Sequence, residues 1–263
     1  MTAGDVSEFS DAVVRLTPDA PLVQLSIENP PLNAMTPEVL RGLWEATAQA
    51  GRYRQMRVLL IRGSREGRFF CPGADLDRLQ GRKPNKPGVN LSEDPRPFEL
   101  PAMLAELSAV TVAGINGSAA GAGFGLAMAC DLRFISSAAR LNSAFLDVGV
   151  AGDLGLAWSL TNKLGPARAA DLMYRPRKVS AQEAVAIGLA SEVFDDTSFD
   201  EQLDAAVQRL VTAKPAAIRG MKDNLTKAGQ LSLRSYLRHE TGRHLVMTRP
   251  DVLADADYDG DVW

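Results

Sequence analysis

Short apolar runs alternate with amphipathic segments along the first half of the chain. The runs are typical of buried strands and occupy residues 13–16, 22–27, 57–62, 110–115 and 132–136. Segments with the spacing of helices lie between them, at residues 36–51, 98–107 and 121–130. Strands that alternate with helices are typical of a sheet covered by helices. The pattern therefore predicts an α/β fold.

Helical spacing predominates after residue 154. Predicted helices occupy residues 154–164, 180–187, 198–212, 215–225 and 231–247. We place a boundary near residue 198, so that residues 1–197 form an α/β core domain and residues 198–263 form a C-terminal helical region. Residues 81–97 are rich in proline and glycine, which predicts a mobile loop.

The composition excludes several classes of protein. The 263 residues are 46% hydrophobic, enough for one large core, and 29 Lys and Arg against 32 Asp and Glu leave no basic footprint for nucleic acid. Two cysteines, Cys71 and Cys130, make no disulfide framework and favour a reducing compartment. No apolar stretch is long enough to span a bilayer, and the start of the chain does not resemble a signal peptide. We expect a cytoplasmic protein with neither nucleic acid nor membrane as a partner.

Two glycine-rich turns stand out as candidates for ligand binding. In residues 69–76 a Pro-Gly turn follows a strand, and Asp75 can cap the short helix that comes next. In residues 116–125 the side chains are so small that a ligand can approach the backbone closely. Each turn alone also has an ordinary structural explanation, as a turn or as close packing. The spacing of the second turn excludes the dinucleotide, serine-hydrolase and P-loop motifs.

Taken together, the two turns and their neighbouring motifs resemble the enoyl-CoA hydratase/isomerase (crotonase) superfamily. The matching motifs lie at residues 31–35, 70–76, 115–125, 129–133, 180–184 and 188–190, and the resemblance covers roughly residues 12–230. It implies a crotonase-like spiral of ββα units with a C-terminal helical oligomerisation region, assembled as a homotrimer or a dimer of trimers. It also implies an acyl-CoA thioester as substrate, with coenzyme A as part of that substrate, no separate cofactor and no metal.

The resemblance also implies an oxyanion hole made of the Ala74 and Ala122 backbone N–H groups. Removing a proton next to a thioester puts negative charge on the carbonyl oxygen, which two preorganised amides at a helix N-terminus stabilise. Further positions are implied to contact the substrate or coenzyme A: Asn33, Ala34, Met35, Gly73, Asp75, Leu76, Gly121, Gly125 and Phe145. Lys222 is a candidate for contact with the coenzyme A phosphates.

The sequence departs from the hydratase pattern at two glutamates. The family resemblance places them at Gly125 and Phe145, so the usual acid and base of hydration are missing here. Asp153 is the candidate replacement, since residues 149–155 resemble the loop that carries a proton-transfer base in dienoyl-CoA isomerases. The same loop carries a nucleophilic aspartate in 4-chlorobenzoyl-CoA dehalogenase. Asp153 also directly precedes a predicted helix, which allows the simpler interpretation of an N-terminal cap. Asp147 is a weaker candidate.

Three functions remain open on the sequence alone. The leading hypothesis is double-bond isomerisation of an acyl-CoA with Asp153 as catalytic base. The second is thioester hydrolysis or dehalogenase-type chemistry at Asp153, although the chain has no histidine before His239 to activate water. The third is an acyl-CoA-binding protein without catalytic activity.

Overall fold

The computed structural model describes residues 6–10, 14–19, 21–64, 66, 69–84, 89–255 and 258. Two sheets organise this part of the chain. The larger has the strand order β1-β2-β3-β4-β6-β8-β11, and the smaller has the order β10-β9-β7-β5. The strands of the larger sheet are β1 (Ser7–Phe9), β2 (Val14–Asp19), β3 (Leu22–Ile27), β4 (Val58–Gly63), β6 (Val110–Ile115), β8 (Leu132–Ser136) and β11 (Glu192–Phe194). Those of the smaller sheet are β5 (Phe69–Cys71), β7 (Ser118–Ala120), β9 (Arg140–Asn142) and β10 (Val179–Ser180).

Helices follow or precede these strands throughout. The α-helices are α1 (Pro37–Ala50), α2 (Leu76–Leu79), α3 (Leu100–Glu106), α4 (Ala122–Ala129), α5 (Leu156–Leu164), α6 (Pro166–Tyr174), α7 (Ala181–Ala186), α8 (Phe199–Val211), α9 (Pro215–Ala228), α10 (Leu233–Met247) and α11 (Pro250–Ala254). Short 3-10 helices occupy Arg96–Glu99, Leu146–Val148 and Asp196–Ser198. The predicted α/β class is confirmed, and the segment after residue 198 is helical where the structure describes it.

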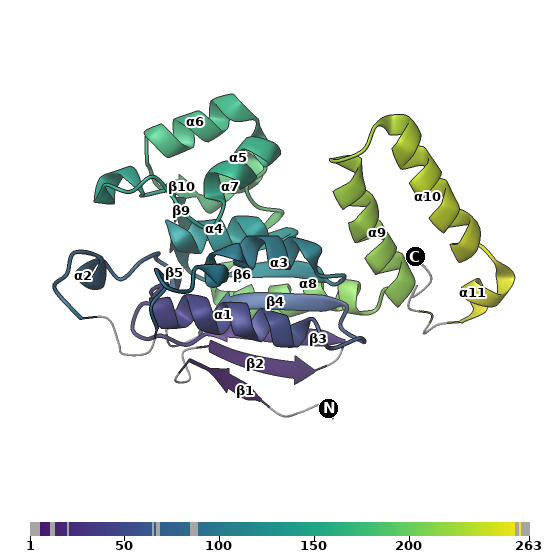
Figure 1. The fold of residues 1–263 in the computed structure, drawn as a ribbon, viewed down its shortest axis with the longest axis horizontal. Helices are drawn as coiled ribbons and strands as arrows, with labels where there is room; N and C mark the ends of the chain where they lie inside the picture. Colours follow the sequence, from purple (N-terminus) through teal and green to yellow (C-terminus); the bar gives the residue numbers. More distant parts are fainter. Residues whose placement is uncertain are drawn as a thin grey trace.

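The larger sheet separates two hydrophobic clusters. The main core lies between this sheet, the smaller sheet and the helices α1, α3 and α4, and it includes Phe70, Phe124 and Ile115. The second cluster lies on the other face of the sheet, where Leu203 and Val207 of α8 pack on β4 and β6. Helix α4 is therefore buried on nearly every side, and Figure 1 shows it at the centre of the molecule, below α5 to α7.

The smaller sheet was not expected from the sequence. Residues 118–120 were predicted as part of a turn, but they form β7, between β5 and β9. Alanine and serine have low intrinsic strand preference, so the local sequence carries little signal for this strand. Its parallel pairing with β5 brings together two segments that lie almost fifty residues apart, so that both glycine-rich turns leave the same edge of one sheet.

Lys222 ties the C-terminal helices to the core. Helices α9 and α10 pack against each other as a hairpin beside the larger sheet (Figure 1). The Lys222 ammonium donates to the carbonyl oxygens of Leu104 and Ala109, at 3.0 and 2.9 Å, and forms an ion pair with Asp131 at 2.8 Å. Its three donors are thus all used, and its side chain is only 7% exposed. The structure does not place Lys222 where a cofactor phosphate could reach it.

This tie makes a testable contribution to stability. We expect Lys222→Met to lower the free energy of unfolding by about 2 kcal/mol, because the Asp131 carboxylate and two carbonyls lose a charged donor. Lys178→Met, at an exposed position, is the matched control and should change stability little. Urea denaturation of the three proteins measures both effects, and equal midpoints for the two variants would contradict the assigned role.

Candidate active site

The first glycine-rich turn connects β5 to α2. Asp75 caps α2, as predicted: its Oδ1 accepts hydrogen bonds from the backbone N–H groups of Asp77 and Arg78, at 3.0 and 3.4 Å. Gly73 has φ +92°, a conformation that favours glycine, and its carbonyl accepts a hydrogen bond from the Met35 N–H at 2.7 Å. Met35 and Ala74 form an isolated parallel β-bridge. The segment around Ala34 is therefore fixed alongside the turn.

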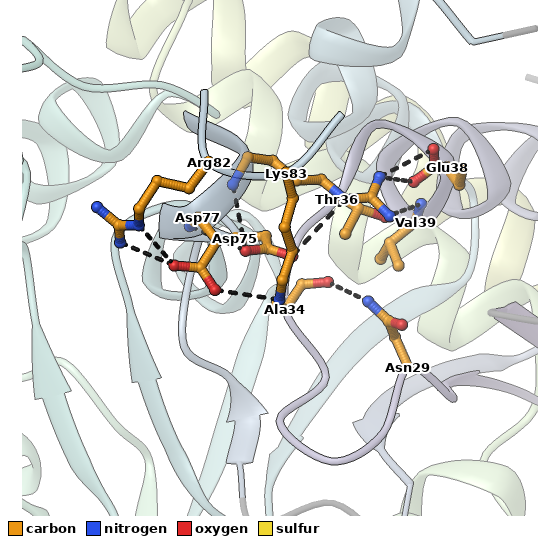
Figure 2. A network of polar contacts seen from close by, with 10 residues as sticks. Asn29, Ala34, Thr36, Glu38, Val39, Asp75, Asp77, Arg82 and Lys83 are labelled. Carbon is orange, nitrogen blue, oxygen red and sulfur yellow. Dashed lines mark hydrogen bonds and ion pairs between the residues drawn. The ribbon is translucent and has the colours of Figure 1, made fainter. Parts of the chain in front are cut away.

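The side chain of Asn33 fixes this segment through hydrogen bonds. Its backbone is left-handed, with φ +59°, and its side chain is fully buried. The side-chain amide donates to the Phe69 carbonyl at 2.8 Å, while Oδ1 accepts from the Asn29 N–H and the Ser64 hydroxyl, at 3.2 and 3.3 Å. Asn29 in turn donates to the Ala34 carbonyl at 2.9 Å (Figure 2). The Asn33 side chain thus positions the segment and offers no free polar atom for substrate.

Ion pairs hold α2 against α1 on the outer side of the turn. Arg78 donates to both carboxylate oxygens of Glu38, at 3.1 and 3.0 Å, and its Nε lies 3.6 Å from Asp75. Figure 2 shows Arg82 and Lys83 paired to Asp77. Leu76, the first residue of α2, is 44% exposed. The outer rim of the turn is therefore charged, and one apolar side chain faces solvent.

The second glycine-rich turn connects β7 to α4 and touches the first. A Cβ built on Gly123 would overlap the Cys71 carbonyl, so only glycine fits there. A Cβ built on Gly73 would lie 2.8 Å from the Ala120 carbonyl oxygen and 3.6 Å from the Ala122 nitrogen. Gly121, with φ +50°, precedes the helix and donates its N–H to the Asn142 carbonyl at 3.1 Å. The two turns thus meet backbone to backbone.

The amides of Ala74 and Ala122 are available at this contact. Within the described part of the chain, neither N–H donates to a carbonyl of another element. Ala122 is the first residue of α4, where an N–H has no partner inside the helix and the helix dipole is positive. Ala74 is exposed, while Ala122 is 3% exposed at the base of the turn. Their convergence on one substrate oxygen remains a prediction.

Gly125 and Phe145, the positions at which the family resemblance places glutamates, lie next to the loop that carries Asp153. A Cβ built on Gly125, on α4, would lie 3.0 Å from the Leu154 Cβ and 3.4 Å from the Asp153 carbonyl oxygen. Phe145 is 6% exposed, and its ring lies 3.8 Å from a Cβ built on Gly152 and 3.6 Å from one built on Gly121. The apolar ring therefore lies between the second turn and the loop before α5.

Asp153 is not a helix cap. The N-cap of α5 is Gly155, without a side-chain cap, and only the backbone carbonyl of Asp153 bonds to the helix, accepting from Leu156 N–H at 3.1 Å. The capping interpretation is therefore wrong. Asp153 Oδ1 is buried and has no hydrogen-bond partner among the described residues. Burial raises the pKa of the Asp153 carboxyl to about 6. A carboxyl with such a pKa can both accept and return a proton near neutral pH.

Cys71 interacts with Asp153 from β5. Burial, with a smaller contribution from the charge of Asp153, raises the pKa of the Cys71 thiol to about 12. The thiol therefore stays protonated at neutral pH and is a core residue, not a nucleophile. Asp147 is exposed, and His239, on α10, is bonded to Asp223 at 2.7 Å. In the described segments, no three His, Cys, Asp or Glu side chains gather as metal ligands would.

Leu154 is the residue of this site that sequence reasoning missed. It has φ +42°, it is 3% exposed, and it packs on Gly125. A leucine in a left-handed conformation carries no sequence signal, because leucine is common in helices and cores. Only the run of glycines around it, at 149, 152 and 155, indicated an unusual backbone.

Comparison with known proteins places this geometry in a family. A model described as "Enoyl-CoA hydratase/isomerase" matches residues 18–250. The Mycobacterium tuberculosis protein named "Probable enoyl-CoA hydratase EchA12" is 34% identical over 195 residues, which cover 72% of this chain and 66% of that protein. The peroxisomal Delta(3,5)-Delta(2,4)-dienoyl-CoA isomerase of Arabidopsis thaliana is 26% identical and covers 93% of this chain and 91% of its own.

A solved structure supports the same family assignment. A Thermobifida fusca protein assigned as an enoyl-CoA hydratase, in complex with CoA, superposes with a TM-score of 0.81. It is 30% identical, and the superposition covers 93% of this chain and 96% of that one. The predicted crotonase-type fold is confirmed. In the described residues, no helix has the length and apolar character needed to cross a membrane.

The unpaired carboxylate should cost stability in a pH-dependent way. The folded-state pKa of Asp153 lies above its ordinary value of 3.8, so the folded protein loses stability as pH rises from about 4 through about 6. We expect the free energy of unfolding of Asp153→Asn to exceed that of the wild type by on the order of 1–3 kcal/mol at pH 8 and by little at pH 4. Urea titrations at several pH values measure the difference, and a pH-independent difference would contradict the burial of this charge.

Proposed function

This chain belongs to the enoyl-CoA hydratase/isomerase family, and we propose that it moves a carbon–carbon double bond in an unsaturated acyl-CoA thioester, with Asp153 as the base. The observation that carries the proposal is the half-buried Asp153 carboxylate, whose buried Oδ1 has no hydrogen-bond partner among the described residues and whose pKa is raised to about 6. A structural aspartate would be paired. A base needs a free oxygen at the reacting carbon.

The reaction needs one carboxylate and two amides. Asp153 removes a proton from the substrate carbon next to the thioester carbonyl or two carbons further along. The electron pair shifts toward the carbonyl and leaves negative charge on its oxygen, which the Ala74 and Ala122 N–H groups stabilise. Asp153 then returns the proton to the other end of the conjugated system. No water is added, and the carboxylate is regenerated.

The same arrangement explains why we do not propose hydration. Hydration requires a group that activates water in addition to one that handles the carbon-bound proton. Positions 125 and 145, where the family resemblance places glutamates, hold glycine and a phenylalanine that is only 6% exposed. One acid that gives back the proton it has taken is sufficient for isomerisation. The relative named as a dienoyl-CoA isomerase, matching over 93% of the chain, supports this choice.

Attack by Asp153 on the substrate is the second candidate, because an unpaired carboxylate oxygen also suits a nucleophile. Hydrolysis of the resulting ester needs a base for water, and His239 is engaged by Asp223 on the C-terminal helices. Mass spectrometry of protein quenched during turnover separates the two: a substrate-derived adduct on the peptide containing Asp153 supports attack, and turnover without any adduct supports proton transfer. If the protein binds acyl-CoA thioesters but turns none of them over, it is an acyl-CoA-binding protein without catalytic activity.

Asp153→Asn should abolish isomerisation. The assay follows the ultraviolet absorbance of conjugated thioesters with a panel of 3-enoyl-CoA and 3,5-dienoyl-CoA substrates of different chain length. We expect kcat to fall by about 100- to 10,000-fold, the usual contribution of a general base. Because the deprotonated form is the active one, wild-type kcat/KM should fall as pH decreases through about 6. Equal rates for the wild type and Asp153→Asn would contradict the proposal.

Ala122→Pro tests the amide donor separately. Proline removes the N–H at the first position of α4, where helices tolerate it. We expect kcat to fall by about 100- to 1000-fold while the fold persists. Leu233→Pro makes the same change at the first residue of α10 and is the control, with activity near wild type. Circular dichroism verifies folding, and an unchanged kcat in a folded Ala122→Pro protein would remove Ala122 from the mechanism.

A further inference from the structure

The ring of Phe145 lies between the two parts of the proposed reaction site. Its Cε1 lies 3.6 Å from a Cβ built on Gly121, the residue before the Ala122 amide. The opposite edge, at Cδ2 and Cε2, lies 3.8 Å from a Cβ built on Gly152, the residue before Asp153. Phe145 is only 6% exposed, so almost none of the ring is open to water. The ring therefore packs against the neighbours of both the amide donor and the base.

The main chain of Phe145 holds the start of the same loop. Its carbonyl oxygen accepts hydrogen bonds from the N–H groups of Val148 and Val150, at 3.2 and 3.1 Å. The first bond closes the 3-10 helix Leu146–Val148, and the second ties the beginning of the loop 149–155 back to Phe145. Both bonds are made by the backbone and persist when the side chain is replaced. A substitution at position 145 therefore tests the ring rather than the course of the loop.

A second apolar side chain lies beside the ring. The Ser143 hydroxyl, which is buried, donates to the Leu172 carbonyl at 2.7 Å and so joins the end of β9 to α6. The next residue of α6, Met173, places its Cε 3.7 Å from the Cβ built on Gly152. Neither a phenylalanine ring nor a methionine side chain can donate a hydrogen bond to a carboxylate. The side chains around Gly152 thus remove water without replacing its hydrogen bonds.

We propose that Phe145 is a positioning residue whose ring takes the place of water beside Asp153, so that the proton removed from the substrate returns to the same substrate molecule. The inference rests on the proposed function, in which Asp153 moves that proton. A protonated carboxyl that contacts water exchanges its proton with the solvent. A ring in place of the water keeps the proton on Asp153 until the other end of the conjugated system accepts it.

Isomerisation in D2O measures the fate of the proton. The reaction is stopped at low conversion, and mass spectrometry counts the deuterium in the product. We expect the wild type to incorporate deuterium in a minority of turnovers. Phe145→Ala makes room for water beside Gly152, so we expect it to incorporate deuterium in most turnovers.

The acid limb of the kcat/KM profile is the second readout. Hydration stabilises the charged form of a carboxylate, so water beside Asp153 lowers its pKa. We expect the limb to move in Phe145→Ala from about 6 toward the ordinary aspartate value of 3.8. The same shift is measured without turnover by comparing the pH dependence of unfolding of Phe145→Ala with that of Phe145→Ala, Asp153→Asn.

The other titratable groups around the loop leave this limb to Asp153. From β5, the Cys71 thiol stays protonated, with a pKa of about 12. Helix α4 carries no titratable side chain. The remaining groups on the elements around the loop are Asp147, Glu106 on α3, Lys163 on α5, and Arg168, Asp171 and Tyr174 on α6. Among the described residues, burial is the cause that raises the pKa of the Asp153 carboxyl.

Phe134→Ala is the matched control. Phe134 lies on β8, is 8% exposed, and stacks on Phe194 with 5.2 Å between ring centroids, in the cluster on the other face of the larger sheet. Both variants lose a buried ring and the stability that it supplies, so general loosening of the fold would appear in both. Only Phe145→Ala should raise the deuterium content and move the limb. If Phe145→Ala does not fold, Phe145→Leu replaces it and should show both changes to a smaller extent.

The outcomes separate this inference from its premise. Wild-type deuterium content or an unmoved acid limb in the folded position-145 variant overturns the role of Phe145. Deuterium in every wild-type product, or the same changes in Phe134→Ala, also overturns it. In each of these cases an inactive Asp153→Asn leaves the proposed function standing, whereas full activity of Asp153→Asn overturns both.

Discussion

The site depends on one contact, in which the backbone of α4 lies directly on the end of β5. Gly123 has no space for a Cβ because the Cys71 carbonyl occupies it. Through this contact the smaller sheet brings β5 and β7 side by side, so that Ala74 and Ala122 leave neighbouring strands with their N–H groups unpaired by other described elements. Backbone groups set by packing of this kind need no reorganisation during a reaction, which is the condition for strong electrostatic stabilisation of an anion.

The surroundings of Asp153 impose a cost in stability. A carboxylate in the partly buried site beside Phe145 loses hydration, and its Oδ1 receives no hydrogen bond in return from the described residues. A protein selected for stability alone would pair that oxygen or replace the residue. The loop around it adds a second cost, a left-handed Leu154. Unfavourable backbone and an unpaired charge at the same place are typical of functional sites.

Periodicity predicted the strands β2, β3, β4, β6 and β8 of the larger sheet and most of the described helices, because their apolar runs and caps are local; β1 and β11 were not predicted. The Thr36 hydroxyl accepts from Val39 N–H, and Asp75 caps α2, as the sequence indicated. The glycine-rich turns were found because small residues are visible in sequence. Strand β7 was missed, since it exists through pairing with β5 and β9. The partners of Lys222 and the absence of a cap at Asp153 could not be predicted for a related reason: burial and partner choice are tertiary properties, which a helical position does not disclose.

The two kinds of group in this site respond differently to sequence change. The candidate anion site is made of main chain and depends on glycines whose replacement would separate β5 from α4, so it constrains the fold itself. The proposed base, by contrast, is a side chain, Asp153, on the loop before α5. Gly125 and Leu154 lie against each other, so the chain departs from the glutamate pattern where α4 meets the loop that carries Asp153. The main-chain part of the candidate site is therefore fixed by the fold, while the reaction depends on the side chains placed around it.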